Sequence, residues 1–277
     1  MSLSRATTIA IAAAALAAAG PVSGPAASPL PRQEPRAQSG GAQSSGAVPD
    51  PLVFCAEAEN PPMSQIGVPA GFDVEVAEAL GSELGVRVRI AWLRPHADVA
   101  ELALLDGRCA AATGATVTEG ATMAGRTPDG VALTRPYYAA AYVLVRAAGA
   151  PPVRTLDALD GRIAVESVSA AAYTLRQRGY SVHVLPDAAA VIEAVAAGRQ
   201  KAGYLWGPLA AWLLRDRRDV VVDGAFEPIE RWSFALAVPS TAGTLRSVLS
   251  GAIEAAAGDG TLAAIFARYG IPQKGVM

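Results

Sequence analysis

The chain has 277 residues, of which 52% are hydrophobic and 17% charged, and its formal net charge is −2. Its basic residues are dispersed, which argues against nucleic acid or an anionic membrane surface as a partner. The length beyond the N-terminal region is ample for one large or two small α/β domains.

The N-terminal region has the pattern of an export signal. Arg5 precedes an Ala-rich apolar run over 6–19, and Gly20–Pro21 follow it. The run is too short to cross a bilayer, and the small residues at its end suit a signal-peptidase cut. We expect residues 1–19 to be a signal peptide that directs the chain to the periplasm, without a transmembrane anchor; an Ala-rich disordered tail is the alternative. Residues 20–50, rich in Pro, Gly, Ser and Ala, are expected to be a flexible linker.

The next part of the chain alternates strand and helix patterns. Phe72–Leu84 has apolar residues at helical spacing and acidic residues in its first half, where they suit the helix dipole. Val86–Trp92 alternates apolar residues with Arg, as a half-buried strand does. The other elements expected here are strands at Leu52–Ala56 and Cys109–Thr113 and a helix at Ala100–Leu105. Together they predict a βαβαβ unit with parallel strands.

A later part of the chain repeats this pattern. Leu84–Ile90 leads through an Ala/Leu-rich segment to Gly107–Arg108 and a buried run, and Arg178–Val184 leads likewise to Gly198–Arg199 and a buried run. The repetition predicts two similar α/β lobes. The elements expected in the second lobe are strands at Arg162–Val165, Val182–Leu185 and Lys201–Leu205, with helices over Ser167–Arg178, Ala188–Ala197 and Leu209–Arg215.

Two further strands are expected to join the lobes. Tyr142–Arg146 and Phe234–Val238 predict crossing strands, so lobe 1 is expected to contain residues 51–146 and 235–277, and lobe 2 residues 147–234. Two crossing strands form a hinge that permits opening and closing. Ligands of open α/β sheets lie beyond the carboxyl ends of the strands, so the cleft between the lobes is the expected functional site. Two helices, broken near Gly258–Gly260, are expected over Thr244–Gly270.

The residues expected in this cleft lie after strand ends or at helix starts. They are Glu57, Asn60, Met63, Gly114, Thr116, Tyr137, Ser167, Ser169, Trp206 and Gly207. Ser169 is a predicted N-cap whose neighbouring amides could hold an anion, and an ordinary cap without a ligand is equally weighted. Tyr137, Tyr138, Trp206 and Met63 would supply apolar anchors, with packing between the lobes as the alternative.

The sequence predicts no catalytic, metal or cofactor site. The two histidines, His96 and His183, have no neighbouring ligands, and no nucleophile elbow, haem motif or phosphate-binding loop occurs. The two cysteines, Cys55 and Cys109, are expected to form a disulfide, because export to an oxidising compartment favours paired thiols. Two buried free thiols are the alternative.

The layout resembles the periplasmic solute-binding proteins that include the polar amino-acid receptors of ABC transporters. The resemblance covers Leu52 to Ile271 and rests on Gly71–Ala77, Leu156–Gly161 and Asp259–Leu262. It implies a type II periplasmic-binding-protein-like α/β fold, which usually works as a monomer.

Stronger motifs are similar to one branch of this group, the quinoprotein-dehydrogenase-associated solute-binding proteins. They are Leu52–Ala56, Gly107–Cys109, Thr134–Tyr138 and above all Leu205–Leu209, which reads Leu-Trp-Gly-Pro-Leu. This resemblance implies a non-catalytic accessory protein that aids a pyrroloquinoline-quinone-dependent alcohol or methanol dehydrogenase, with that enzyme and its cytochrome c as partners. The branch also pairs cysteines at these two places, which adds support for the disulfide.

The sequence departs from the amino-acid receptors at both charge partners of their ligand. Where those receptors carry an Arg for the ligand carboxylate, this chain has Glu119–Gly120, and where they carry an Asp for the ammonium it has Trp206–Gly207. Losing both partners removes the fork that holds a zwitterion. Arg126 or Arg135 could substitute, although Arg135 beside a proline is expected to brace the hinge.

Three functions follow from these patterns. The leading one is the dehydrogenase accessory, its cleft holding a small ligand or a segment of the partner. The second is a transport receptor for a small solute other than an ordinary amino acid. The third is a lyase or dehydratase that uses cleft carboxylates, with Glu57, Asp73 and Glu166 as candidates.

Overall fold

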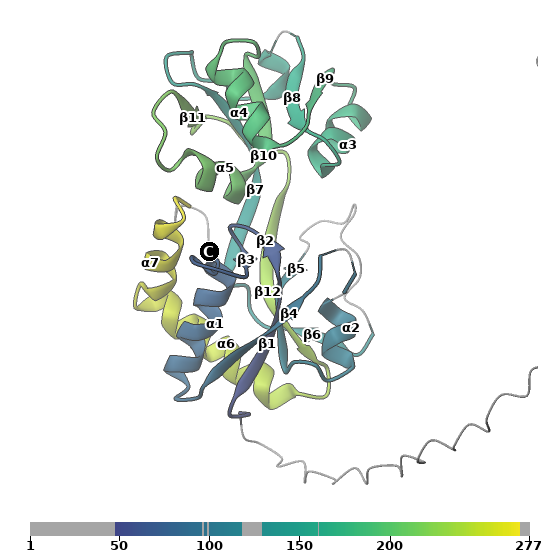
Figure 1. Ribbon diagram of the computed structural model, residues 1–277, viewed down its shortest axis with the longest axis vertical. Coiled ribbons are helices and arrows are strands. Elements are labelled where there is room, and N and C mark those ends of the chain that lie inside the picture. Colours follow the sequence, from purple (N-terminus) through teal and green to yellow (C-terminus); the bar gives the residue numbers. More distant parts are fainter. Residues whose placement is uncertain (1–47, 96, 99, 118–128, 160, 272–277) are drawn as a thin grey trace, which may run out of the picture. The chain divides into compact units, whose positions relative to one another are not determined.

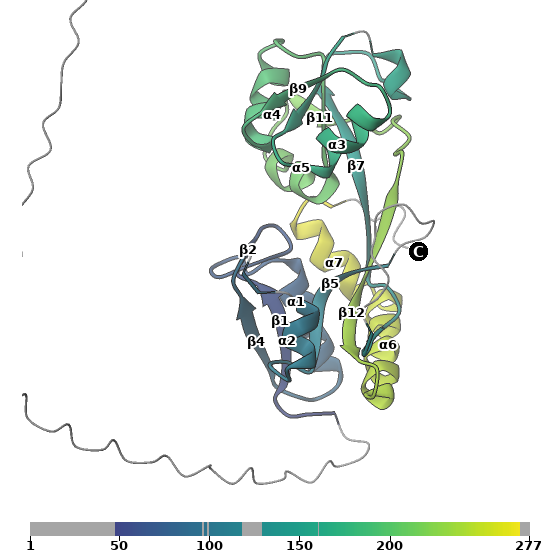
Figure 2. The same ribbon diagram turned by 90° about the vertical axis from the view of Figure 1, so that its right-hand side faces the viewer.

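The computed structural model describes residues 48–95, 97–98, 100–117, 129–159 and 161–271. The expected signal peptide and almost all of the expected linker lie outside these residues. The described residues contain a ten-stranded sheet whose main path is β4-β1-β5-β12-β7-β10-β8-β9 (Figures 1 and 2).

The first strands and helices form the predicted βαβαβ unit. β1 (Leu52–Glu57) pairs in parallel with β4 (Val88–Leu93) on one side and with β5 (Ala111–Val117) on the other. Helices α1 (Phe72–Glu83) and α2 (Ala100–Leu105) make the two connections between these strands (Figure 1). Because all three strands run in the same direction, their carboxyl ends meet at one edge of the sheet.

The start of α1 is fixed by a close approach of two backbone segments. Gly71 has φ 101°, and a Cβ at this position would lie 2.3 Å from the carbonyl oxygen of Met63. Only glycine therefore fits before the helix. Met63 belongs to a small hairpin of β2 (Glu59–Asn60) and β3 (Ser64–Gln65), which the sequence predicted as a loop because two-residue strands carry no period.

The second half repeats the parallel arrangement. β8 (Ile163–Glu166) pairs in parallel with β9 (Val182–Leu185) and with β10 (Ala202–Trp206). Helices α3 (Ala170–Gln177) and α4 (Ala188–Ala196) connect these strands, as the sequence repetition predicts. A short 3-10 turn over Leu156–Ala158 precedes β8, and α5 (Gly207–Leu214) follows β10 without a loop.

Two long strands run between the halves, and both extend further than predicted. β7 (Tyr138–Ala147) pairs with β12 (Arg231–Pro239) through its first residues and with β10 through its later ones. β12 pairs in turn with β5, so one sheet is continuous through both halves (Figure 2). Two short strands were not predicted. β6 (Val131–Leu133) pairs with β12, and β11 (Val220–Val222) pairs with β7.

The chain ends its described part with two helices, as predicted. α6 (Gly243–Gly258) and α7 (Thr261–Arg268) are separated at Asp259–Gly260. Phe266 and Tyr269 pack their rings against Phe72 of α1 at centroid distances of 5.4 and 5.8 Å. No single described helix is long and apolar enough to cross a membrane; α6 and α7 reach that length only together, with a bend of 74° between them.

The disulfide favoured by the sequence is present. Cys55 lies on β1, Cys109 lies just before β5, and their Cα atoms are 5.6 Å apart across the bond. Neighbouring parallel strands place the two residues side by side, which the sequence spacing alone could not show. Both residues are buried.

Candidate functional site

A polar pocket lies at the carboxyl end of β1 and beside Ala112–Ala115 of β5. Its volume is about 300 Å³, and we call it the acidic pocket. Its polar lining residues are Glu57, Asn60, Ser64, Asp73, Asp98, Glu101 and Thr113. None of the described residues that line it is basic. The pocket therefore presents carboxylates and neutral hydrogen-bonding groups to a ligand.

Asp73 is the most deeply buried carboxyl group of the acidic pocket. It is only 4% exposed, because it lies in the first turn of α1 on the face that packs against the sheet. The Tyr137 hydroxyl donates a hydrogen bond of 2.6 Å to Asp73 Oδ1 and accepts one of 3.1 Å from the Gly114 amide. These contacts tie the start of α1 to β5 and to the residue before β7.

Burial raises the pKa of Asp73 to about 7. Hydrogen bonds from Tyr137 and Thr113 lower this pKa but do not outweigh burial, and the nearby charge of Glu57 raises it further. The pKa of Tyr137 is also raised well above its usual value, first by burial and then by the charge of Asp73, so its hydroxyl stays protonated. Asp73 is therefore a carboxyl group that changes charge near neutral pH.

The other three acidic residues differ in how their charge is balanced. Asp98 accepts hydrogen bonds from the Arg94 amide, the Arg94 side chain and the Arg108 side chain, and these lower its pKa. Glu57 and Glu101 form no ion pair with any described residue. Among the described residues the pocket therefore keeps unbalanced negative charge, which favours a ligand with a positive charge.

The start of α3 is satisfied by the chain itself. The Ser169 hydroxyl accepts a hydrogen bond of 3.2 Å from the Ala172 amide, as predicted for an N-cap, and donates one of 2.8 Å to the Glu166 carbonyl. Burial, then the charge of Glu166, raise the pKa of Tyr142, while hydrogen bonds from the first amides of α3 lower it. These amides already face a side-chain hydroxyl, so nothing here marks an anion site.

An aromatic cluster surrounds the hinge strands. The Trp206 ring lies 5.4 Å from Tyr142, 5.7 Å from Trp232 and 5.9 Å from Phe234, measured between ring centroids. Trp206 is half-buried and ends β10. The next residue, Gly207, has no room for a side chain, because a Cβ there would lie 2.6 Å from the Ala141 carbonyl oxygen.

The structure brings some of the predicted cleft residues together. Glu57, Asn60 and Gly114 line the acidic pocket, and Tyr137 reaches it through its hydrogen bonds to Asp73 and Gly114. The other predicted residues lie elsewhere around the strand ends and the hinge: Met63, Thr116, Ser167, Ser169, Trp206 and Gly207. A ligand-binding role for any of these residues stays a prediction.

Tyr137 and Tyr138 are core residues. They are 1% and 3% exposed. Their rings therefore pack in the core, which was the alternative to a role as exposed apolar anchors. Met63 is half-buried and packs against the same core.

The sequence analysis named Asp73 as a candidate cleft carboxylate of a lyase or dehydratase but did not include it among the expected ligand-binding residues. A usable signal was present, because Asp73 shares a helical stripe with Val76, Ala77 and Leu80, which are all buried. An acid on an apolar stripe is costly unless it is hydrogen-bonded, so it indicates a specific partner. Ser64 and Thr113 had no comparable signal.

The arginines considered as clamps do not line the pocket where they are described. Arg135 forms an ion pair with Glu254 of α6, and its amide donates to Ser250, so it ties the chain before β7 to α6. Arg126, Glu119 and Gly120 lie outside the described residues. Within the described ranges, no group of three or more His, Cys, Asp or Glu residues is placed to hold a metal ion.

A comparison with protein-family models identifies the family of this chain. The model of the bacterial extracellular solute-binding proteins, family 3, matches residues 52–272. The chain belongs to this family. Members of the family bind small solutes outside the cytoplasm, as its description states.

Solved structures show the same fold for this solute-binding protein. The second substrate-binding domain of GlnP from Lactococcus lactis is 15% identical, with 79% of this chain and 94% of that chain covered and a TM-score of 0.65. The second substrate-binding domain of a putative amino acid ABC transporter from Streptococcus pneumoniae is 16% identical, with coverage of 79% and 99% and a TM-score of 0.65.

An ancestral cationic amino acid solute-binding protein is 22% identical, with coverage of 79% and 95% and a TM-score of 0.63. At these identities the likeness shows the fold alone. A comparison with curated protein sequences gave no match.

Proposed function

We propose that this family 3 protein is a non-catalytic periplasmic receptor for a small cationic solute that lacks a carboxylate. The observation that carries the proposal is the acidic pocket, where Glu57 and Glu101 are unpaired among the described residues and no described lining residue is basic. A zwitterionic amino acid needs a cation for its carboxylate, and neither this lining nor the satisfied start of α3 supplies one. Amines, amino alcohols and similar cations fit the charge.

Matched pairs of ligands test this proposal. Agmatine and arginine, or cadaverine and lysine, differ only in the carboxylate. We expect isothermal titration to show tighter binding of the amine in each pair. Glu57→Gln should weaken the amine about tenfold, in line with one charge-assisted contact, while Glu78→Gln on the exposed face of α1 should not. Equal or tighter binding of the amino acids would contradict the proposal.

The pH dependence of binding gives a second readout. Because the pKa of Asp73 is about 7 in the free protein, a bound cation should favour its charged form and release a proton below that pH. Amine binding should therefore strengthen as the pH rises through 7. Asp73→Asn should abolish this pH dependence.

A second candidate function is support of a pyrroloquinoline-quinone-dependent alcohol or methanol dehydrogenase. Two observations favour it: the cysteine pair of the resembling branch is bonded here, and its Trp-Gly-Pro motif lies in the hinge, where a side chain at Gly207 would meet the Ala141 carbonyl oxygen. The two candidates differ in the recipient, a permease or a dehydrogenase with its cytochrome c. Pull-down of a purified quinoprotein dehydrogenase by the full chain would support this role, and loss of that capture in Trp206→Ala would place the contact at the hinge. No capture at micromolar concentrations would count against it.

A further inference from the structure

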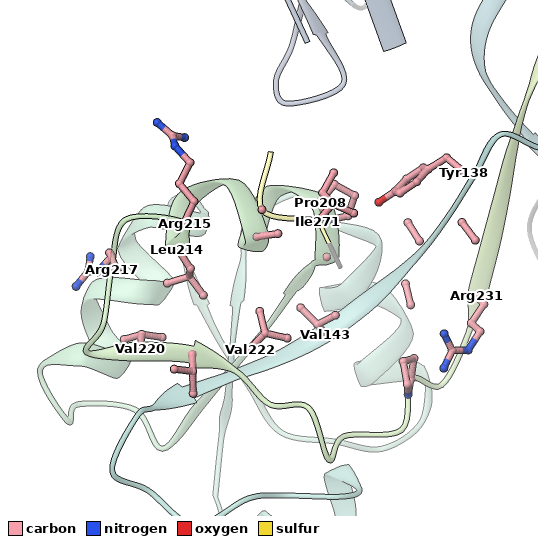
Figure 3. Close-up of a pocket in the computed structure, with 18 residues that line it drawn as sticks. Tyr138, Val143, Pro208, Leu214, Arg215, Arg217, Val220, Val222, Arg231 and Ile271 are labelled. Atoms are coloured by element: carbon pink, nitrogen blue, oxygen red, sulfur yellow. The ribbon is translucent and has the colours of Figure 1, made fainter. Parts of the chain in front are cut away.

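A second pocket lies beside the hinge strands and shares no lining residue with the acidic pocket. It has a volume of about 390 Å³, and we call it the hinge pocket (Figure 3). α5, β7, β11 and the residues after α7 contribute its walls. The larger apolar side chains that line it are Val143, Pro208, Leu214, Val220, Val222 and Ile271. Its size and apolar walls are those of sites for small organic ligands.

The Tyr138 hydroxyl points into this apolar space and has no hydrogen-bond partner among the described residues. Tyr138 is 3% exposed, and its ring packs against Phe72, Phe234 and Phe266 at centroid distances of 5.0, 5.7 and 5.1 Å. Its hydroxyl forms no hydrogen bond with any described residue, and Figure 3 shows it directed toward Pro208 and Ile271. No buried side-chain polar atom of the described residues lacks a partner, so this hydroxyl is accessible from the pocket and can donate or accept a hydrogen bond with an occupant.

The charged residues that line the hinge pocket are three arginines, Arg215, Arg217 and Arg231. Arg215 pairs with Asp216 and stacks on Trp212, and Arg217 pairs with Glu193 and Asp219. These two guanidinium groups are already satisfied.

The third rim arginine, Arg231, differs from these two. Arg231 is exposed and forms no ion pair with any described residue. The adjacent acids do not balance it, because Glu227 pairs with Arg154 and Glu230 with Arg178. An anionic group is therefore the complement of this part of the rim.

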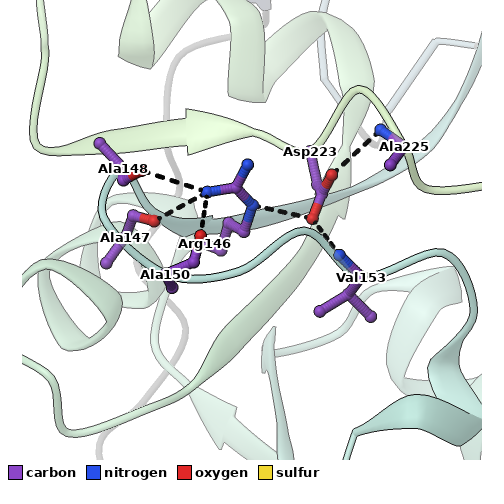
Figure 4. Close-up of polar contacts among 7 residues, drawn as sticks. All are labelled: Arg146, Ala147, Ala148, Ala150, Val153, Asp223 and Ala225. Atoms are coloured by element: carbon purple, nitrogen blue, oxygen red, sulfur yellow. Dashed lines mark hydrogen bonds and ion pairs between the residues drawn. The ribbon is translucent and has the colours of Figure 1, made fainter.

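The walls of the hinge pocket are held in place by a buried ion pair (Figure 4). Arg146 of β7 donates to Asp223 at 2.8 Å and to three backbone carbonyls of the turn that follows. Asp223 is 3% exposed and also accepts from the amides of Val153 and Ala225. The contacts fix β11 and the loop after it against β7, so the pocket is preformed rather than dependent on a ligand for its shape.

We propose that the hinge pocket binds a small amphipathic carboxylate with a second polar group at its far end. The carboxylate pairs with Arg231, the apolar body lies against Val143 and Leu214, and the far group hydrogen-bonds with the Tyr138 hydroxyl. Tyr138 and Arg231 both line this pocket and belong to the paired strands β7 and β12, where Phe234 lies opposite Tyr138 and Arg231 opposite Ala141. A phenolic carboxylate such as 3-(4-hydroxyphenyl)propionate carries these two polar groups at opposite ends of an apolar body. This site is independent of the cation proposed for the acidic pocket.

Isothermal titration of the full chain with three probes tests the proposal. The probes are 3-(4-hydroxyphenyl)propionate, 3-phenylpropionate without the hydroxyl and 3-(4-hydroxyphenyl)propan-1-ol without the carboxylate. We expect the first to bind more tightly than either of the others. Tyr138→Phe should weaken the phenolic acid about fivefold and leave phenylpropionate unchanged, since one neutral hydrogen bond is lost. Arg231→Gln should weaken both acids about tenfold and remove the salt dependence of their binding.

Two controls separate binding from folding. Arg246→Gln removes another exposed arginine, on α6 outside both pockets, and should leave all three affinities unchanged. Tyr138→Phe should unfold at the same or a higher temperature in the absence of probe, because its hydroxyl has no partner to lose. Equal affinity of the three probes, unchanged affinity in both pocket variants, or a crystal structure of the full chain with its own side chains filling the pocket would overturn the proposal.

Discussion

At the scale of single residues, Asp73 decides the electrostatics of the acidic pocket. Its carboxyl group is buried by α1 and receives a hydrogen bond from Tyr137, yet its pKa is raised to about 7 because burial outweighs that bond. In the unfolded chain the same group ionises near its ordinary value. Between about pH 4 and pH 7 the folded state therefore holds a proton that the unfolded state has lost, and stability falls as the pH rises through this window.

Asp73→Asn should remove this loss. The amide oxygen still accepts from Tyr137 and never carries a charge. We expect the variant to be more stable than the wild type at pH 8 by roughly 4 kcal/mol, and the difference to shrink toward pH 4. Urea unfolding from pH 4 to pH 8 measures it, with Asp106→Asn, an exposed acid without an ion pair, as the control. A constant difference between variant and wild type across this range would show that Asp73 is charged throughout.

The same residue shows what the sequence could and could not predict about the site. Glu57 and Asn60 lie at and just beyond the end of β1, so the rule that ligands lie at the carboxyl ends of parallel strands was enough to place them. Gly114 was placed by the end of the predicted strand Cys109–Thr113, but the structure shifts this strand to Ala111–Val117, so Gly114 lies within it. Asp73 was marked by its position on a buried helical stripe, a signal that was overlooked. Its partner Tyr137 lies 64 residues further along the chain, and no local pattern predicts a hydrogen bond over that distance.

At the scale of elements, the join between β10 and α5 is the tightest point of the hinge. The strand ends at Trp206, and the helix begins at the very next residue, Gly207. The Ala141 carbonyl of β7 occupies the space that any side chain would need. The Trp-Gly-Pro motif thus combines a ring in the aromatic cluster, a position without a side chain, and a proline in the first turn, where its missing N–H has no cost.

Gly207→Ala should therefore disturb the hinge. The added methyl group would meet a backbone oxygen at 2.6 Å, so the start of α5 must shift, at a cost of about 2 kcal/mol or more. Gly251→Ala is the matched control, because that position lies in α6 with open space around it and should gain about 1 kcal/mol from helix propensity. Thermal unfolding of both variants measures the contrast. Equal stability of the two would show that the hinge tolerates a side chain at this position.

Elements of ordinary length were predictable, while very short ones were not. α2 and β9 have the predicted bounds, and α1, α4 and α6 differ by a few residues, because each carries a period or a clear terminal residue. β6 and β11 have three residues each, too few to show a period in the sequence, and they are strands because they pair with the long strands beside them. β7 and β12 are longer than predicted because one strand passes from one hydrophobic cluster to the next, and the alanines of β7 give little periodic contrast.

At the scale of the whole molecule, the repeated pattern predicted the architecture correctly. Two parallel units share one sheet, and two strands pass between them. The lobe limits at 146/147 and 234/235 stay predictions, because β7 and β12 run without interruption near these positions. The monomeric state also stays a prediction.

The disulfide restricts the unfolded chain over a long distance, because it links two residues that are 54 positions apart in the sequence. A loop of this length corresponds to about 4 kcal/mol in the chain-entropy estimate. Replacing both Cys55 and Cys109 with alanine should lower the free energy of unfolding by about that amount. Dithiothreitol should lower the urea midpoint of the wild type toward that of the double variant and leave the variant unchanged. A wild-type midpoint that does not respond to full reduction would show that the crosslink adds nothing.

The pairing of β5 with β12 has a consequence for how the protein is made. Ala115 lies opposite Ala235, so the first parallel unit acquires its neighbouring strand only after the whole second unit has been synthesised. While the chain emerges from a ribosome or a translocation channel, β5 keeps an unsatisfied edge that another polypeptide could occupy. A chaperone that shields this edge until residue 235 arrives would serve this topology better than one that acts on the finished protein.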